Sequence, residues 1–243
     1  MIFHKMNFEE AKKNAIQDIN NKASIGEEQE KLVHGTLKNY FEADKTKQEV
    51  KIDGFIADIF NEYGIIEIQT RAYDKLRHKL DVYLEHIPVT IVCPIIENTY
   101  IVYVDDENKE EMRKSPKHQS IVHIFKELYK IKYYLNHPNL HFHFVYLDIK
   151  DYKRENGLNR FKKIRYTSIQ KEPIIINKEE DYDNYHDFIH ILDGIDEFSV
   201  KSLSKSLKAP RKETSYLVLI LKYLNLITQT GKIKREYLYK VNR

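Results

Sequence analysis

Three short apolar segments, EVKIDG, FIADIF and GIIEIQT, follow one another between residues 49 and 70. Turn residues separate them: Asp53-Gly54 lies between the first two segments and Glu62-Tyr63-Gly64 between the second and the third. Short apolar runs joined by such turns are typical of antiparallel strands. We therefore predict a three-stranded β-meander at this point of the chain.

Helix and strand patterns alternate around the meander. Residues 26–41 carry Leu32, Leu37 and Phe41 among charged residues at roughly helical spacing, which predicts an amphipathic helix. A charged helical stretch over residues 73–85 is followed by the apolar runs VTIVCPII and TYIVYVDD, which we predict to be two strands. The predicted order is αβββαβ, that of an α/β domain with a mixed sheet.

The next hundred residues are less regular. An exposed basic loop and then a helix are expected within residues 113–135, and HFHFVYLDI, residues 141–149, is predicted to be a strand. Residues 150–180 have a mixed pattern that predicts no single element.

The pattern changes after about residue 181. A helix is expected to end near Leu192, a second over SVKSLSKSL with Ser199 as its N-cap, and a third over ETSYLVLILKYLNLI. The last segment, TQTGKIKREYLYKV, has two β-prone arms about Gly231, which predicts a hairpin. Three helices and a hairpin predict a winged helix-turn-helix, so we expect two domains, residues 1–175 and 181–243.

Charge is distributed unevenly between these two parts. Residues 198–243 hold 11 Lys or Arg against 2 Asp or Glu, a balance of +9, although the whole chain carries only +3. The rest of the chain is therefore acidic. A compact basic region of this kind is typical of a surface that contacts a phosphate backbone. A lysine-rich solvated face is the alternative interpretation.

Two carboxylates are expected to converge on adjacent strands of the meander. Because side chains alternate along a strand, Asp58 shares a face with Ile56 and Phe60, and Glu67 shares a face with Gln69. Removing two carboxylates from water is costly unless a cation compensates. Hard oxygen ligands favour Mg²⁺ or Mn²⁺, so the sequence predicts a divalent metal held by Asp58 and Glu67.

In these features the chain resembles the PD-(D/E)XK nuclease superfamily over residues 26–96. The resemblance rests on the αβββαβ order, an acid in the second strand, Asp58, and a Glu-X-Gln in the third, Glu67 to Gln69. It implies a restriction-endonuclease-like core whose acids bind metal. The first helix of the family often adds a glutamate, for which Glu28 fits, with Glu27 and Glu30 as competitors.

The chain departs from the family at Gln69, where a lysine normally stands. A lysine would orient the attacking water and offset negative charge, whereas glutamine can hydrogen-bond the water but brings no charge. We expect Lys75, or alternatively Lys79, in the following helix to supply that charge.

The predicted DNA contacts fall into two groups. Near the nuclease cleft they are Arg71, Arg77 and the basic loop residues Arg113, Lys114 and Lys117. In the C-terminal domain, Lys212, Ser215 and Tyr216 are expected near the start of a recognition helix, and Lys232, Lys234 and Arg235 on the hairpin.

Other chemistries find little support. Cys93 lies in an apolar run, which predicts a buried, reduced thiol. His186 and His190 are spaced as in a zinc helix but lack a third ligand, and His141 and His143 have no evident acid partner. With 7 glycines the chain has no glycine-rich phosphate loop. Without an apolar run of membrane length or a signal sequence, we expect a cytoplasmic protein.

The sequence therefore predicts a Mg²⁺-dependent DNA endonuclease whose C-terminal domain binds DNA. A catalytically inactive nuclease fold that binds DNA or regulates is the alternative, and Gln69 permits it. A nuclease directed to RNA or to junctions is a third hypothesis, because one fold accepts many substrates. Cutting a duplex needs two active sites, which predicts a homodimer.

Overall fold

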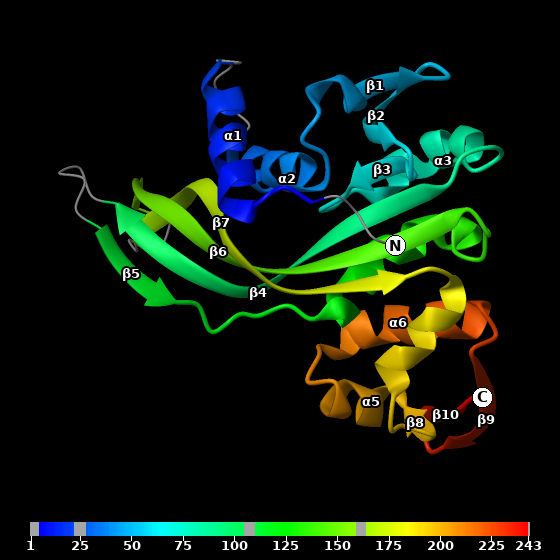
Figure 1. The fold of residues 1–243 in the computed structure, drawn as a ribbon. Coiled ribbons are helices and arrows are strands. Elements are labelled where there is room, and N and C mark those ends of the chain that lie inside the picture. The colour runs from blue at the N-terminus through cyan, green and yellow to red at the C-terminus, as the bar shows by residue number, and fades with distance from the viewer. Residues whose placement is uncertain (1–4, 22–27, 105–109, 159–163, 243) are drawn as a thin grey trace.

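The computed structural model describes residues 5–21, 28–104, 110–158 and 164–242. They form an α/β protein with a seven-stranded mixed sheet and a separate three-stranded antiparallel sheet. The large sheet has the strand order β1-β2-β3-β4-β6-β7, with β5 paired to β4 (Figure 1).

The strands of the large sheet are β1 (Gln48–Ile52), β2 (Phe55–Asn61), β3 (Gly64–Ile68), β4 (Val89–Val104), β5 (Glu110–Lys114), β6 (Leu140–Leu158) and β7 (Ile164–Tyr182). The helices around it are α1 (Phe8–Asn21), α2 (Glu28–Phe41), η2 (Tyr73–Leu76), α3 (Arg77–Tyr83), η3 (Ile121–Ile124), α4 (Phe125–Leu128) and η4 (Tyr129–Tyr134), and the short turn η1 (Lys45–Lys47) precedes β1. Among the helices in the described ranges, none has the length and apolar character needed to cross a membrane.

The predicted meander is confirmed: β1 pairs with β2 and β2 with β3, both antiparallel. Gly64 closes the second turn with φ at +100°, a left-handed conformation that other residues avoid. A Cβ atom at this position would also collide with the carbonyl of Pro88, so the turn requires glycine.

Three predictions about the middle of the chain are corrected. The runs predicted as two strands form one continuous strand, β4, which pairs with β3 at one end and β5 at the other. The strand predicted over residues 141–149 is only the first half of β6. Residues 150–158 complete β6 and residues 164–180 form most of β7, and the two strands are a long antiparallel pair. Helix α1 was not predicted.

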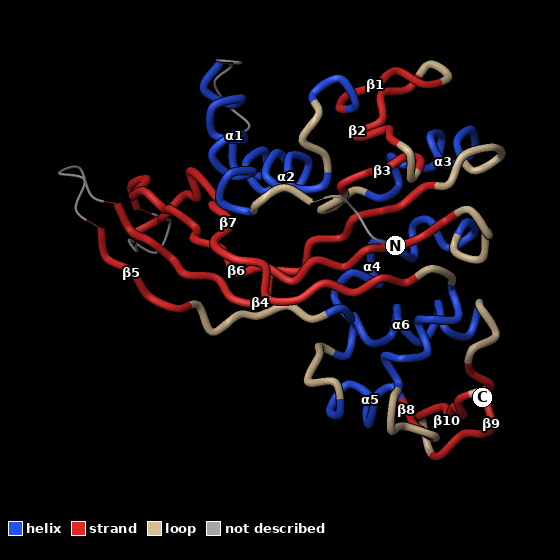
Figure 2. The backbone as a smooth tube through the Cα atoms, in the orientation of Figure 1, coloured by secondary structure: helices blue, strands red, loops and turns tan. Residues whose placement is uncertain are grey.

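Helices cover both faces of the large sheet (Figures 1 and 2). On one face, α2 packs Val33, Leu37 and Phe41 into a cluster with the strands. On the other face a larger cluster begins at Ala57 and Ile65, includes residues of α3 and α4, and continues without a break into the C-terminal elements.

The C-terminal elements are η5 (Tyr185–Leu192), β8 (Glu197–Ser199), α5 (Val200–Ser206), α6 (Arg211–Tyr223), β9 (Ile227–Ile233) and β10 (Glu236–Val241). The predicted cap is confirmed, since the Ser199 side chain accepts a hydrogen bond from the Ser202 amide. The hairpin turns at Lys234 and Arg235 and not at Gly231, which is paired with Leu238 inside the ladder. The predicted end of the first domain, residue 175, falls within β7.

Candidate active site

The two strands that carry the predicted acids separate at Asp58. The ladder between β2 and β3 pairs Asn61 with Gly64 and ends where Ile59 meets Ile66. Beyond that point the carboxylate of Asp58 replaces the strand partner, because its Oδ2 accepts the backbone N–H of Ile68 at 2.8 Å. Ala57 and Ile59 are two positions apart and would share one face of a regular strand. Here they pack into clusters on opposite faces of the sheet, so strand β2 twists at Asp58.

Glu67 lies on the neighbouring strand and is almost completely buried, with 2% of its surface exposed. Lys79 of α3 donates to both of its carboxylate oxygens, each at 2.8 Å, and also to the carbonyl of Ile56 on β2 at 2.6 Å. The lysine therefore joins the two strands at the point where they separate.

The two carboxylates differ in their protonation. Burial raises the pKa of Glu67, and the nearby charge of Asp58 raises it further, to about 7, even though Lys79 opposes both effects. For Asp58, burial would raise the pKa, but hydrogen bonds from His34 and from the Ile68 amide outweigh burial and lower it. The site thus holds one ionised carboxylate beside one that titrates near neutral pH.

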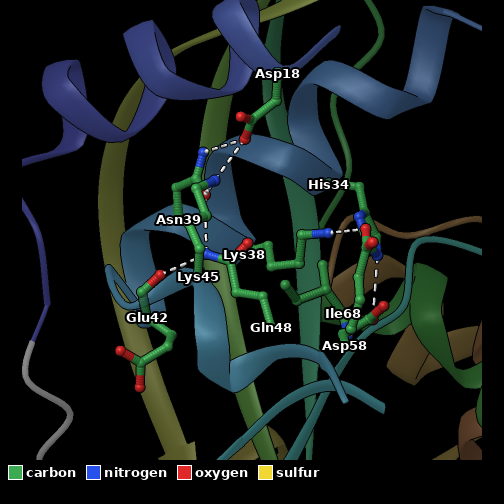
Figure 3. A network of polar contacts seen from close by, with 10 residues as sticks. Asp18, His34, Lys38, Asn39, Glu42, Lys45, Gln48, Asp58 and Ile68 are labelled. Atoms are coloured by element: carbon green, nitrogen blue, oxygen red, sulfur yellow. Dashed lines mark hydrogen bonds and ion pairs between the residues drawn. The ribbon is translucent and has the colours of Figure 1, made fainter. Parts of the chain in front are cut away.

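His34 of α2 is a member of this site that the sequence analysis missed. Its Nε2 lies 3.1 Å from Oδ2 of Asp58, and Figure 3 shows the ring directed at that carboxylate. Four residues later on the same helix face, Lys38 donates to Glu49 of β1 at 2.6 Å. No local sequence pattern indicates His34, because its partner lies 24 positions away in the chain.

The lysine beside Glu67 is Lys79 and not the predicted Lys75. Lys75 lies in η2 and is exposed, whereas Lys79 borders the buried stripe formed by Leu76, Leu80 and Tyr83. Helical spacing of three and four residues places Lys79 beside that stripe, so the position can be rationalised from the sequence. Gln69 directs its side-chain amide to the Arg71 carbonyl.

The site offers a cation two carboxylates, and both oxygens of Glu67 already accept hydrogen bonds from Lys79. No three His, Cys, Asp or Glu side chains within the described residues gather as metal ligands. Mg²⁺ needs fewer, since it is commonly held by one or two carboxylates and completed by water and phosphate oxygens. In the described part of the chain, Oδ1 of Asp58 accepts no hydrogen bond. The predicted helical ligand Glu28 begins α2, but its side chain lies outside the described residues, as do those of Glu27 and Glu30.

Tyr83 adds a second unsatisfied group to the site. Its side chain is buried, and its hydroxyl has no hydrogen-bond partner among the described residues. Burial and the charges of Glu67, Asp53 and Asp58 raise the pKa of this hydroxyl to about 12. The hydroxyl is therefore close enough to both site acids to be affected by their charge. A buried hydroxyl donor without a partner is costly, and the oxygen of a ligand within its reach would satisfy it.

The residues predicted to contact DNA near the cleft lie in different places. Arg71 and Lys117 are exposed, but Arg77 uses its guanidinium to hold the Lys130 carbonyl, at 2.6 and 2.8 Å. Arg113 stacks on Tyr103, and the ammonium of Lys114 lies 5.9 Å from the Tyr100 ring centre.

Arg113 and Lys114, predicted to lie in a loop, belong to strand β5, and this part of β5 is not beside the carboxylates. Glu67 pairs with Ile91 and Arg113 with Ile101, ten residues further along β4. Ten residues of strand correspond to about 33 Å. Arg113 and Lys114 therefore belong to the far end of the sheet.

The predicted C-terminal contacts are partly exposed. Lys212 is the second residue of α6 and is exposed, and Ser215 donates to the Arg211 carbonyl. Tyr216 is half-buried against Tyr129, with ring centres 5.5 Å apart. The hairpin residues Lys232, Lys234 and Arg235 are all exposed.

Two further predictions concern buried groups. Cys93 is a free, buried thiol as predicted, and burial raises its pKa to about 12. His143, predicted to lack an acid partner, has two: its ring nitrogens lie 2.6 Å from Asp181 and 2.6 Å from Glu179, both on β7. The exposed His186 and His190 lie on η5, with His190 3.7 Å from Asp193.

Replacing Glu67 with glutamine is expected to stabilise the metal-free protein at high pH. The pKa of Glu67 rises from 4.5 to about 7 on folding, so its ionisation opposes folding increasingly as the pH rises between those values. Glu67→Gln removes this cost, on the order of 3 kcal/mol above pH 7, and changes little below pH 4.5. Urea unfolding in EDTA from pH 4 to 9 measures the difference, and a destabilised variant at pH 9 would contradict it.

Comparison with known proteins yields no assigned activity. The model of a family described as a domain of unknown function, DUF8091, matches residues 31–183. An uncharacterized protein of Treponema pallidum (strain Nichols) is 31% identical over 156 residues, which cover 63% of this chain and 61% of that protein. The chain therefore spans less than two thirds of the relative's length. No solved structure matches.

Proposed function

This chain belongs to the DUF8091 family of domains of unknown function, and we propose that it is a metal-dependent endodeoxyribonuclease with a PD-(D/E)XK-like core. One observation carries the proposal: Asp58 and Glu67 meet where β2 separates from β3, and Lys79 binds the buried Glu67. Burying charged side chains costs free energy, and groups with perturbed pKa values cluster at functional sites. Two acids and a lysine at the point where two strands separate suit phosphodiester hydrolysis.

Each residue has a role that follows from its contacts. Asp58 and Glu67 would hold Mg²⁺ or Mn²⁺, which when bound supplies the charge that activates water and stabilises the developing negative charge on phosphate. Lys79 brings the positive charge that Gln69 lacks, and orients the Glu67 carboxylate. His34 holds Asp58 in position through its 3.1 Å contact.

The C-terminal elements support the DNA-binding part of the proposal. Their order of helix, strand, two helices and two strands, with β10 between β8 and β9, is compatible with a winged helix. Their positive charge suits a phosphate backbone. For duplex cleavage we propose a homodimer, since each strand needs its own site.

Incubation of supercoiled plasmid and single-stranded DNA with the purified chain tests the activity. Cleavage is expected with Mg²⁺ or Mn²⁺, and none with EDTA. Asp58→Asn is expected to abolish it, because the amide cannot compensate the cation's charge. Glu49→Gln is a matched control, since that carboxylate lies on β1 and pairs with Lys38 instead.

Two other outcomes would change the assignment. Metal-dependent cleavage that survives Asp58→Asn would place the active site elsewhere. Salt-sensitive DNA binding without cleavage under any metal would favour the inactive, regulatory form of the fold. The Gln69 side-chain amide donates to the Arg71 carbonyl and so is not directed at the carboxylates. This contact is compatible with the inactive alternative.

A further inference from the structure

Four tyrosines and one lysine form a ladder between α6 and η4. Tyr216 of α6 packs on Tyr129 of η4, with ring centres 5.5 Å apart. Seven residues further along α6 and four further along η4, Tyr223 meets Tyr133 at 5.9 Å. The ammonium of Lys132 lies 4.8 Å from the ring centre of Tyr129, 4.9 Å from that of Tyr133 and 5.6 Å from that of Tyr223.

The outer end of this ladder is open to solvent. Tyr133 is 70% exposed and Tyr223 40% exposed, while Leu219, one turn before Tyr223, is 48% exposed. Spacings of three and four residues place Leu219 and Tyr223 on the face of α6 that begins with Lys212. We call Tyr133, Tyr223 and Lys132 the tyrosine platform.

The rings of the platform contact each other and Lys132 in the unbound chain. Each outer ring is held edge-to-face by the other, at 86°, and both lie against the same ammonium. Aromatic side chains that are exposed and already ordered can bind a flat partner with little loss of conformational freedom.

The chemistry of the platform favours a nucleobase. Aromatic rings beside a cation are the usual means of binding unpaired strands, because every base has a face that stacks and every linkage carries a negative charge. The platform includes part of α6, which belongs to the region with a balance of +9. A protein partner would need a larger apolar surface than two tyrosines and one leucine provide.

We infer that the tyrosine platform binds unpaired bases of a single nucleic-acid strand, with Lys132 meeting the adjacent phosphate. The inference rests on the proposed nuclease function and adds to it a second contact, outside the carboxylate site. It identifies the substrate class as one with unpaired nucleotides, such as a flap, a gap or a melted end.

Binding of a labelled 20-nucleotide oligothymidine in EDTA, followed by fluorescence anisotropy, tests the inference with the full chain. Tyr133→Ala is expected to weaken binding by about tenfold, and Tyr133→Phe to bind as the wild type, because stacking needs the ring and not the hydroxyl. Lys132→Gln is expected to reduce the slope of log affinity against log salt by about 0.7.

Tyr166→Ala is the matched control. Tyr166 is 44% exposed on β7 and packs on Tyr103, away from α6, so its loss is expected to leave affinity unchanged. Circular dichroism and thermal melting confirm that each variant is folded.

The possible outcomes separate the two proposals. If the protein cleaves plasmid DNA but Tyr133→Ala does not change its affinity for the oligonucleotide, the inference about the tyrosine platform is wrong and the proposed nuclease activity stands. Tyr133-dependent binding without any cleavage would support the platform and overturn the nuclease. A Tyr133→Ala variant that changes only the sedimentation of the protein would show a contact between protein copies and overturn the inference.

Discussion

Replacing Lys79 with methionine is expected to slow DNA cleavage by about 10²- to 10³-fold, the usual effect of removing a preorganised charge from an active site. The reason is geometric: Lys79 donates to both oxygens of the buried Glu67 and to the strand β2 that carries Asp58. Single-turnover cleavage at saturating protein measures the rate, and anisotropy with duplex DNA in EDTA measures binding separately.

Lys75→Met is the matched control for this prediction. Both lysines lie between Tyr73 and Tyr83, but Lys75 is exposed on η2 and is expected to tolerate the change with no loss of rate. If Lys75→Met were the slower variant, the positive charge that Gln69 lacks would come from η2, and the role assigned to Lys79 would be wrong.

Replacing His143 with phenylalanine is expected to destabilise the protein by about 3 kcal/mol at pH 5.5, because it leaves two carboxylates facing an apolar ring. Burial would lower the pKa of His143, but its hydrogen bonds to Asp181 and Glu179 raise it above 6.5. Burial would raise the pKa of Glu179, but hydrogen bonds from His143 and Lys5 lower it to about 2.

These shifts fix the pH range of the effect. The contribution of the protonated His143 is present below pH 6.5 and is lost as the pH rises through its higher folded value. The contribution of Glu179 is present above pH 4.5 and is lost as the pH falls toward 2. The difference between variant and wild type is therefore largest between pH 4.5 and 6.5.

Urea unfolding across that range measures this difference. His141→Phe serves as the control, since His141 lies two residues earlier on β6 and contacts only the backbone carbonyl of Asp183 among its described partners. An equal loss of stability at pH 5.5 and pH 9 would show that His143 acts by packing against Phe41 and not by its charge.

The meander could be predicted because its signals are local. Turn residues at Gly54 and Gly64 and the alternation around Asp58 act over a few positions, and β2 and β3 form where expected. The C-terminal helices were also predicted from local periodicity, and the Ser199 cap is confirmed.

The missed features depend on contacts between distant residues. His34 and Asp58 are 24 positions apart, and His143 and Asp181 are 38 apart, so no local pattern links them. The β6 and β7 pair was missed because its register shifts repeatedly, and each shift interrupts the alternation that indicates a strand. Lys75 was preferred to Lys79 because the sequence does not mark the change from η2 to α3.

Because β4 is one continuous strand, the length of strand between the carboxylates and β5 can be compared with the length of a DNA duplex. The same strand pairs with Glu67 at Ile91 and with Arg113 at Ile101, and no loop intervenes between them. The intervening strand is about 33 Å long, which is close to the rise of ten base pairs, or one turn of B-form DNA, at about 3.4 Å each. A duplex whose backbone met both the carboxylates and β5 would therefore extend along β4 for about one helical turn.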